Sequence, residues 1–127
     1  MRSEAFRRAV ESEDLSGFEE LFAEDARFSS PVVFKPYEGR DAIRVILEAV
    51  LHVFEDFRYV EHVDGDDTAF LMFEARVGEM QLQGIDILRF ADDDRIAELT
   101  VMVRPMSGMH ALAEAMRRQL EAATARG

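Results

Sequence analysis

The order of periodic segments in this chain predicts an α+β fold, with helices first, then a run of strands, then one more helix. Apolar residues have helical spacing up to residue 54, and residues 56–104 mostly follow the two-residue period of strands. Short turn signals separate consecutive strands, so we expect them to pair antiparallel. This segregation predicts a curved antiparallel sheet with the helices packed on it.

Four helices are expected, each from an apolar stripe. The first covers about residues 4–12, and the second covers 14–23 with Leu15 and Phe18 on one side. The third is the clearest, because six apolar residues between Ile43 and Phe54 fall on one face and Asp41 suits the positive end of the helix dipole. The last begins after Pro105, which stops the sheet, and turns Leu112, Met116 and Leu120 inward.

Five strands are expected, over about residues 26–30, 56–63, 68–77, 79–90 and 95–104. Pro31 closes the first of these, and residues 32–39 form a loop. Asp64-Gly65, Gly78 and the aspartates at 92–94 mark the turns between the later strands. No repeat or linker interrupts the pattern, so residues 1–127 are expected to form a single domain.

Composition excludes several classes of partner. The formal net charge of -11 disfavours nucleic acid and anionic membranes, and no run approaches the ~20 apolar residues of a membrane span. The chain has no cysteine, which excludes thiolate chemistry and fits a cytoplasmic location. The three histidines lack metal-ligand spacing and no nucleotide-binding motif occurs, so we expect neither a metal nor another cofactor.

Several strands are apolar on both faces. In residues 70–77, for example, Phe70 and Met72 point to one face of the strand, and Leu71 and Phe73 point to the other. A sheet of this kind needs two covers, and the helices supply only one. A second subunit is the economical source of the other, so we expect a homodimer through the outer sheet face.

Asp86 is the strongest candidate for a functional residue. It lies in the middle of an otherwise apolar strand and shares a face with Gly84 and Leu88. A carboxylate in apolar surroundings costs several kcal/mol unless it is paired, protonated or used in function. Asp86 is therefore either a pocket acid or base, or a structural carboxylate paired with an arginine or a backbone N–H.

Four short stretches carry a recognisable combination of residues, namely 21–28, Ser30-Pro31, 38–43, and 85–90 followed by 95–99. In these stretches the chain resembles the nuclear transport factor two-like superfamily, in its SnoaL-like and ketosteroid-isomerase-like branch. The resemblance covers nearly the whole chain. It implies a cystatin-like cone, in which a curved sheet wraps around helices and encloses a pocket, commonly in a dimer. It does not imply one activity, because this fold carries isomerases, cyclases and non-catalytic proteins.

The resemblance carries over residue by residue to only one catalytic position of the isomerases. Asp86 lies where they have a protonated carboxylic acid that helps to bind an oxyanion. Their general-base aspartate is replaced by Ser30 and their catalytic tyrosine by Phe6. A serine cannot move protons as a carboxylate does without an activating base. We therefore expect steroid double-bond isomerisation to be absent or at most weak.

The remaining candidates each have a structural alternative. Ser30 either contacts a ligand or bonds its own backbone at the strand end, and Tyr37 either contacts a ligand or is simply packed. Tyr59 either presents its hydroxyl inward or does not, and the direction of His62 is left open. The apolar residues expected to line the pocket with Asp86 are Phe28, Leu71, Phe73, Leu82, Leu88, Val101 and Val103.

A pocket of this kind suits a small hydrophobic molecule that bears one carbonyl, phenol or hydroxyl group. Three hypotheses follow. The first is an isomerase-, cyclase- or lyase-like enzyme that acts by proton transfer through Asp86. The second is a non-catalytic binder of a similar molecule, and the third is a structural dimerisation domain without a pocket.

Overall fold

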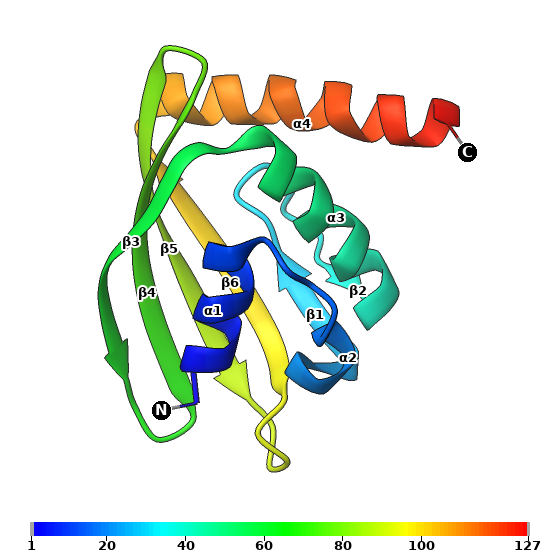
Figure 1. Cartoon of the computed structure of the whole chain (residues 1–127), viewed down its shortest axis with the longest axis vertical. Helices are drawn as coiled ribbons and strands as arrows, with labels where there is room; N and C mark the ends of the chain where they lie inside the picture. Colours follow the sequence, from blue (N-terminus) through cyan, green and yellow to red (C-terminus); the bar gives the residue numbers. More distant parts are fainter. Residues whose placement is uncertain (1, 127) are drawn as a thin grey trace.

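The computed structural model describes residues 2–126, which form one six-stranded sheet with helices packed on it (Figure 1). The α+β class predicted from the sequence is confirmed. The helices are α1 (Glu4–Ser12), α2 (Phe18–Leu21), α3 (Arg40–Val53) and α4 (Met106–Arg126). The strands are β1 (Phe22–Ser29), β2 (Tyr37–Glu38), β3 (Glu55–Asp64), β4 (Thr68–Val77), β5 (Met80–Phe90) and β6 (Ile96–Arg104).

The sheet has the strand order β2-β1-β6-β5-β4-β3. The hairpins from β3 to β6 pair antiparallel, as expected, but β1 pairs parallel with β6. The expectation of a wholly antiparallel sheet is therefore wrong at this pair. No hairpin links β1 to β6, so turn signals could not fix the relative direction of these two strands.

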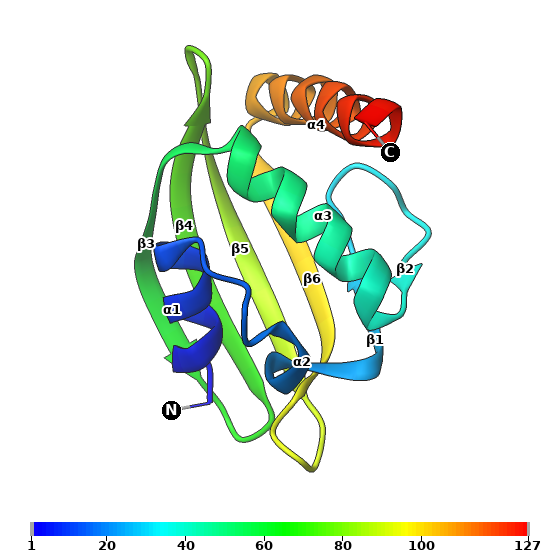
Figure 2. The same ribbon diagram turned by 45° about the vertical axis from the view of Figure 1, so that its right-hand side comes forward.

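The helices cover one face of the sheet, and this sandwich holds the core. Both views place α1, α2 and α3 in front of the strands, with α4 across one end of the sheet (Figures 1 and 2). The core side chains with almost no exposed surface include Phe18, Phe22, Ile43, Leu71, Leu88 and Leu99. None of the helices in the described part of the chain is long and apolar enough to cross a membrane.

The segment expected as a helix over residues 14–23 is mostly something else. Only one turn, α2, is helical, and β1 begins at Phe22. The carboxylate of Asp14 accepts a hydrogen bond from the N–H of Ser16 at 3.0 Å, which favours a turn over a continuing helix. The apolar stripe was correct about burial, because Phe18 and Phe22 stack with ring centroids 4.6 Å apart. The expected loop at 32–39 likewise contains the short strand β2.

Gly84 of β5 makes room for an aromatic ring on the inner face of the sheet. It lies directly opposite Phe73 of β4. A Cβ atom at this position would overlap the Phe73 ring. The absence of a side chain at Gly84 therefore lets Phe73 lie across β5.

Candidate functional site

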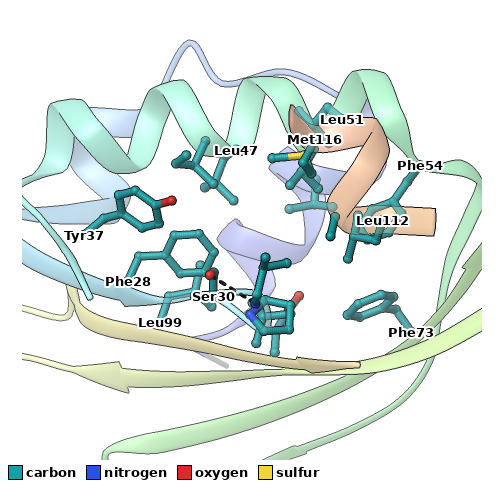
Figure 3. A pocket seen from close by; sticks show the side chains of 18 of the residues that line it. Phe28, Ser30, Tyr37, Leu47, Leu51, Phe54, Phe73, Leu99, Leu112 and Met116 are labelled. Carbon is teal, nitrogen blue, oxygen red and sulfur yellow. Dashed lines mark hydrogen bonds between the residues drawn. The ribbon is translucent and has the colours of Figure 1, made fainter. Parts of the chain in front are cut away.

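A cavity of about 530 Å³ lies between the helices and the inner face of the sheet. This volume falls in the range of roughly 300–1,000 Å³ that is typical of small-molecule sites. Its wall is mainly apolar and draws on strands, α3 and α4 alike (Figure 3). Representative wall residues are Phe28, Leu47, Phe73, Leu99, Leu112 and Met116.

Asp86 contributes a carboxyl group to this apolar wall. It sits in the middle of β5, opposite Leu71 and Val101, and is 7% exposed. The hydroxyl of Tyr59 donates a hydrogen bond of 2.7 Å to Asp86 Oδ2. Among residues 2–126, no basic side chain lies within ion-pair distance of Asp86. Asp86 is therefore not a structural carboxylate paired with an arginine among these residues.

The second carboxyl oxygen of Asp86, Oδ1, has no hydrogen-bond partner among the described residues. Among these residues, Tyr59 is the one side chain that bonds the Asp86 carboxyl group, and it does so through Oδ2. Yet no fully buried side-chain oxygen or nitrogen in that part of the chain lacks a partner. Unpartnered Oδ1 is therefore not fully buried, and since Asp86 lines the cavity, we take Oδ1 as the oxygen available to a ligand there.

The electrostatics of the pair follow from its burial. Burial raises the pKa of Asp86 to about 7, and the hydrogen bond from Tyr59 acts in the opposite direction. The pKa of Tyr59 is raised well above its usual value, chiefly by burial and then by the charge of Asp86. At neutral pH Asp86 therefore populates both its acid and its carboxylate form, while Tyr59 stays a donor. A group with this pKa is suited to acid–base chemistry at physiological pH.

The backbone of β3 determines which of two residues, Tyr59 or His62, reaches the site. Tyr59 is in register with Phe73 of β4, so its ring lies on the inner face and lines the cavity. The register shifts between Tyr59 and Glu61, and His62 beyond the shift is exposed and does not contribute to the cavity wall. No sequence signal marks this shift, which is why the directions of Tyr59 and His62 could not be predicted.

Ser30 and Tyr37 both line the cavity. The Ser30 hydroxyl accepts hydrogen bonds from the N–H groups of Val32 and Val33, at 3.3 and 3.1 Å. This is the structural alternative considered for Ser30, although the hydroxyl hydrogen is still available to donate. The Tyr37 ring packs on Phe28, and its hydroxyl points towards the cavity (Figure 3).

Four of the residues expected at the pocket wall lie elsewhere. Leu71, Leu82, Leu88 and Val103 share the inner face of the sheet but do not line the cavity. Leu71 and Leu88 are fully buried in the main core, and Leu82 and Val103 pack in a second cluster with Leu112. Alternation along a strand gives the face of a residue, but helix packing decides which part of that face stays open. Phe28, Phe73 and Val101 do line the cavity.

The helical part of the wall was not predicted. Residues of α1, α3 and α4 contribute much of the lining, as do Val32 and Val33 of the loop before β2. An apolar stripe on a helix has the same pattern whether it meets core atoms or a cavity. In the part of the chain that the structure describes, no three histidine, aspartate or glutamate side chains gather as metal ligands.

Comparison with known proteins gives a consistent assignment. The model of the SnoaL-like domain family matches residues 3–99. A crystal structure named as a steroid delta-isomerase from Pseudomonas aeruginosa is 44% identical, with 98% of this chain and 92% of that chain covered and a TM-score of 0.94. None of the curated proteins matches the chain.

Two further structures extend the likeness. An uncharacterised protein from Silicibacter pomeroyi with a cystatin-like fold is 30% identical, covers 94% of this chain and 85% of its own, and has a TM-score of 0.89. IdmH from Streptomyces antibioticus, provisionally assigned as a polyketide cyclase, is 18% identical over 88% of this chain and 96% of its own, with a TM-score of 0.68, and shares the fold. The chain therefore belongs to the SnoaL-like family of the nuclear transport factor two-like superfamily.

Proposed function

We propose that the protein binds a small, largely apolar molecule that carries one carbonyl or hydroxyl group, and that Asp86 transfers a proton on this molecule. The observation that carries the proposal is the asymmetry of the Asp86 carboxyl group. Tyr59 bonds Oδ2, whereas Oδ1 has no partner among the described residues, and the Asp86 side chain lines the apolar cavity. A ligand oxygen or an acidic C–H bond placed at Oδ1 would meet a carboxyl group that exists in both protonation states near neutral pH.

For a ketone, the proposed chemistry is enolisation. The carboxylate form of Asp86 takes a proton from the carbon next to the carbonyl, and the C–H electron pair moves into an enolate. Protonated Asp86 then returns a proton to carbon, so the balance closes without a cofactor. The apolar wall orients the ligand and excludes water, which strengthens electrostatic effects at Oδ1.

The name of the 44% identical Pseudomonas aeruginosa structure also favours a cyclic ketone as the ligand. Efficient steroid isomerisation is not part of the proposal, because Ser30 stands where the resemblance implies a base. Its hydroxyl oxygen already accepts two backbone hydrogen bonds, and no carboxylate touches it among the described residues. We expect at most slow conversion of a 5-ene-3-ketosteroid, measurable by the absorbance of the conjugated product.

A bicyclic ketone without other functional groups, 2-decalone, tests the proposal directly. Exchange of its α-hydrogens in deuterated water can be followed by NMR with wild-type protein and with the Asp86→Asn variant. We expect the wild-type protein to accelerate exchange and the variant to lose about 10²-fold to 10⁴-fold of the protein-dependent rate, which is the usual contribution of a general base.

The control is Asp92→Asn, which removes a carboxylate from an exposed turn and should leave the exchange rate unchanged. Binding is measured separately by calorimetry. Binding without exchange would replace the enzyme by the non-catalytic binder, and equal exchange by wild type and Asp86→Asn would remove Asp86 from the mechanism. If neither 2-decalone nor 2-naphthol binds, the small-ligand proposal fails as a whole.

We also propose that a second copy of the chain covers the outer sheet face. Phe70 and Met72 of β4 are 40% and 37% exposed there, and Met102 of β6 is 56% exposed. Met72, Ile85 and Met102 lie side by side across three strands, so the apolar surface is continuous. Charges of both signs lie around it, namely Arg58, Glu74, Arg89, Glu98 and Arg104. A two-fold copy could match such a rim with opposite charges, whereas the net charge of -11 would otherwise keep copies apart.

Analytical ultracentrifugation tests the dimer. We expect wild-type protein to sediment as a particle of twice 14.5 kDa, and Met72→Glu to sediment as a monomer because the new charges would be buried unpaired. Met106→Glu, at an exposed position at the start of α4, should leave the dimer intact. A wild-type monomer at micromolar concentration would refute this part of the proposal.

A further inference from the structure

The loop between β1 and β2 exposes three consecutive apolar side chains beside the mouth of the cavity. Val32 and Val33 are about half exposed, and Phe34 is fully exposed. Pro31, Val32 and Val33 also line the cavity, so this loop forms part of its rim. In both overall views the loop passes below α4, which contributes the exposed rim residues His110, Glu114 and Arg117 (Figures 1 and 2).

Little holds residues 31–36 to the rest of the fold. Among the described residues, their hydrogen bonds are the two from Val32 and Val33 to the hydroxyl of Ser30, which is the neighbouring residue in the chain. Pro31 and Pro36 lie at the two ends of the segment and fix their own φ angles. A segment with few tertiary hydrogen bonds and little buried surface opens and closes at low free-energy cost.

We infer that Phe34 is a ligand-binding residue, and that the loop over residues 31–36 closes its side chain over an apolar ligand in the cavity. The inference rests on the proposed function, since it needs a ligand. An apolar molecule in the open cavity would leave part of its surface facing water at the rim. Moving Phe34 onto that surface buries two apolar groups at once, which stabilises the closed form only when the ligand is present.

The chain has no tryptophan, so Phe34→Trp places a single fluorophore at the tip of the loop. We expect saturating 2-decalone to move the Trp emission to shorter wavelength and to reduce its quenching by acrylamide. The matched control is Val45→Trp, on an exposed part of α3 that does not line the cavity, where neither signal should change.

A second variant measures the energetic effect. We expect Phe34→Ser to weaken 2-decalone binding by about fivefold to tenfold, as expected for losing the burial of about half a phenylalanine side chain, whereas Val45→Ser leaves it unchanged. Calorimetric binding with unchanged Trp emission and unchanged Phe34→Ser affinity would overturn the lid and leave the proposed function standing. Binding of neither 2-decalone nor 2-naphthol by the wild-type protein would overturn both.

Discussion

The free energy of unfolding should fall by on the order of 4 kcal/mol as the pH rises from about 4 to about 8, and Asp86→Asn should abolish this fall. The cause is the pKa of Asp86, which burial raises from 3.8 to about 7. Between these values the folded protein holds a proton that the unfolded chain has released. The stabilisation is therefore fully present below about pH 4 and is lost as the pH rises through about 7.

Urea denaturation at a series of pH values measures this effect. At pH 8 the Asp86→Asn variant should be more stable than the wild type, because it avoids a buried negative charge while its side-chain oxygen can still accept the hydrogen bond from Tyr59. Near pH 4 the two proteins should be of similar stability. Asp92→Asn, in an exposed turn, should follow the wild-type curve. Parallel curves for wild type and Asp86→Asn would mean that Asp86 does not titrate near neutral pH.

The sequence was sufficient to single out Asp86 but not its partner. A carboxylate in an apolar strand is conspicuous because its burial is costly in any fold. Tyr59, by contrast, lies in a strand whose register shifts one residue later, and no local signal shows which face it takes. The pair exists only because β3, β4 and β5 lie side by side, with Tyr59 opposite Phe73 and Asp86 opposite Leu71.

The same distinction holds for the fold. The hairpins from β3 to β6 could be predicted because turn residues and alternation act over short distances. The parallel pairing of β1 with β6 joins segments about 70 residues apart, and nothing in either segment encodes it locally. The cavity could not be predicted either. It is the space that the packed helices and sheet leave unfilled, so no single residue or local pattern indicates it.

Tyr59→Phe should raise the pKa of Asp86 above about 7, because the hydrogen bond from the Tyr59 hydroxyl stabilises the carboxylate form. A hydrogen bond to a charged group contributes about 1.5–3 kcal/mol, which corresponds to an upward shift of roughly 1–2 pH units. The carbon-13 resonance of the Asp86 carboxyl group reports the midpoint directly. The pH profile of 2-decalone exchange should move in the same direction.

The matched control for Tyr59→Phe is Tyr37→Phe, which removes a second cavity hydroxyl that makes no hydrogen bond to Asp86 among the described residues. It should leave the midpoint of Asp86 in place. The comparison separates the effect of the hydrogen bond on the pKa of Asp86 from the effect of removing a hydroxyl from the cavity. Both variants lose one oxygen from the same cavity, but only Tyr59 bonds the carboxylate. If the carboxylate is the proton acceptor, exchange at pH 7 falls in Tyr59→Phe as the ionised fraction falls, and recovers at higher pH. A rate that stays low at every pH would instead make the Tyr59 hydroxyl itself part of the chemistry.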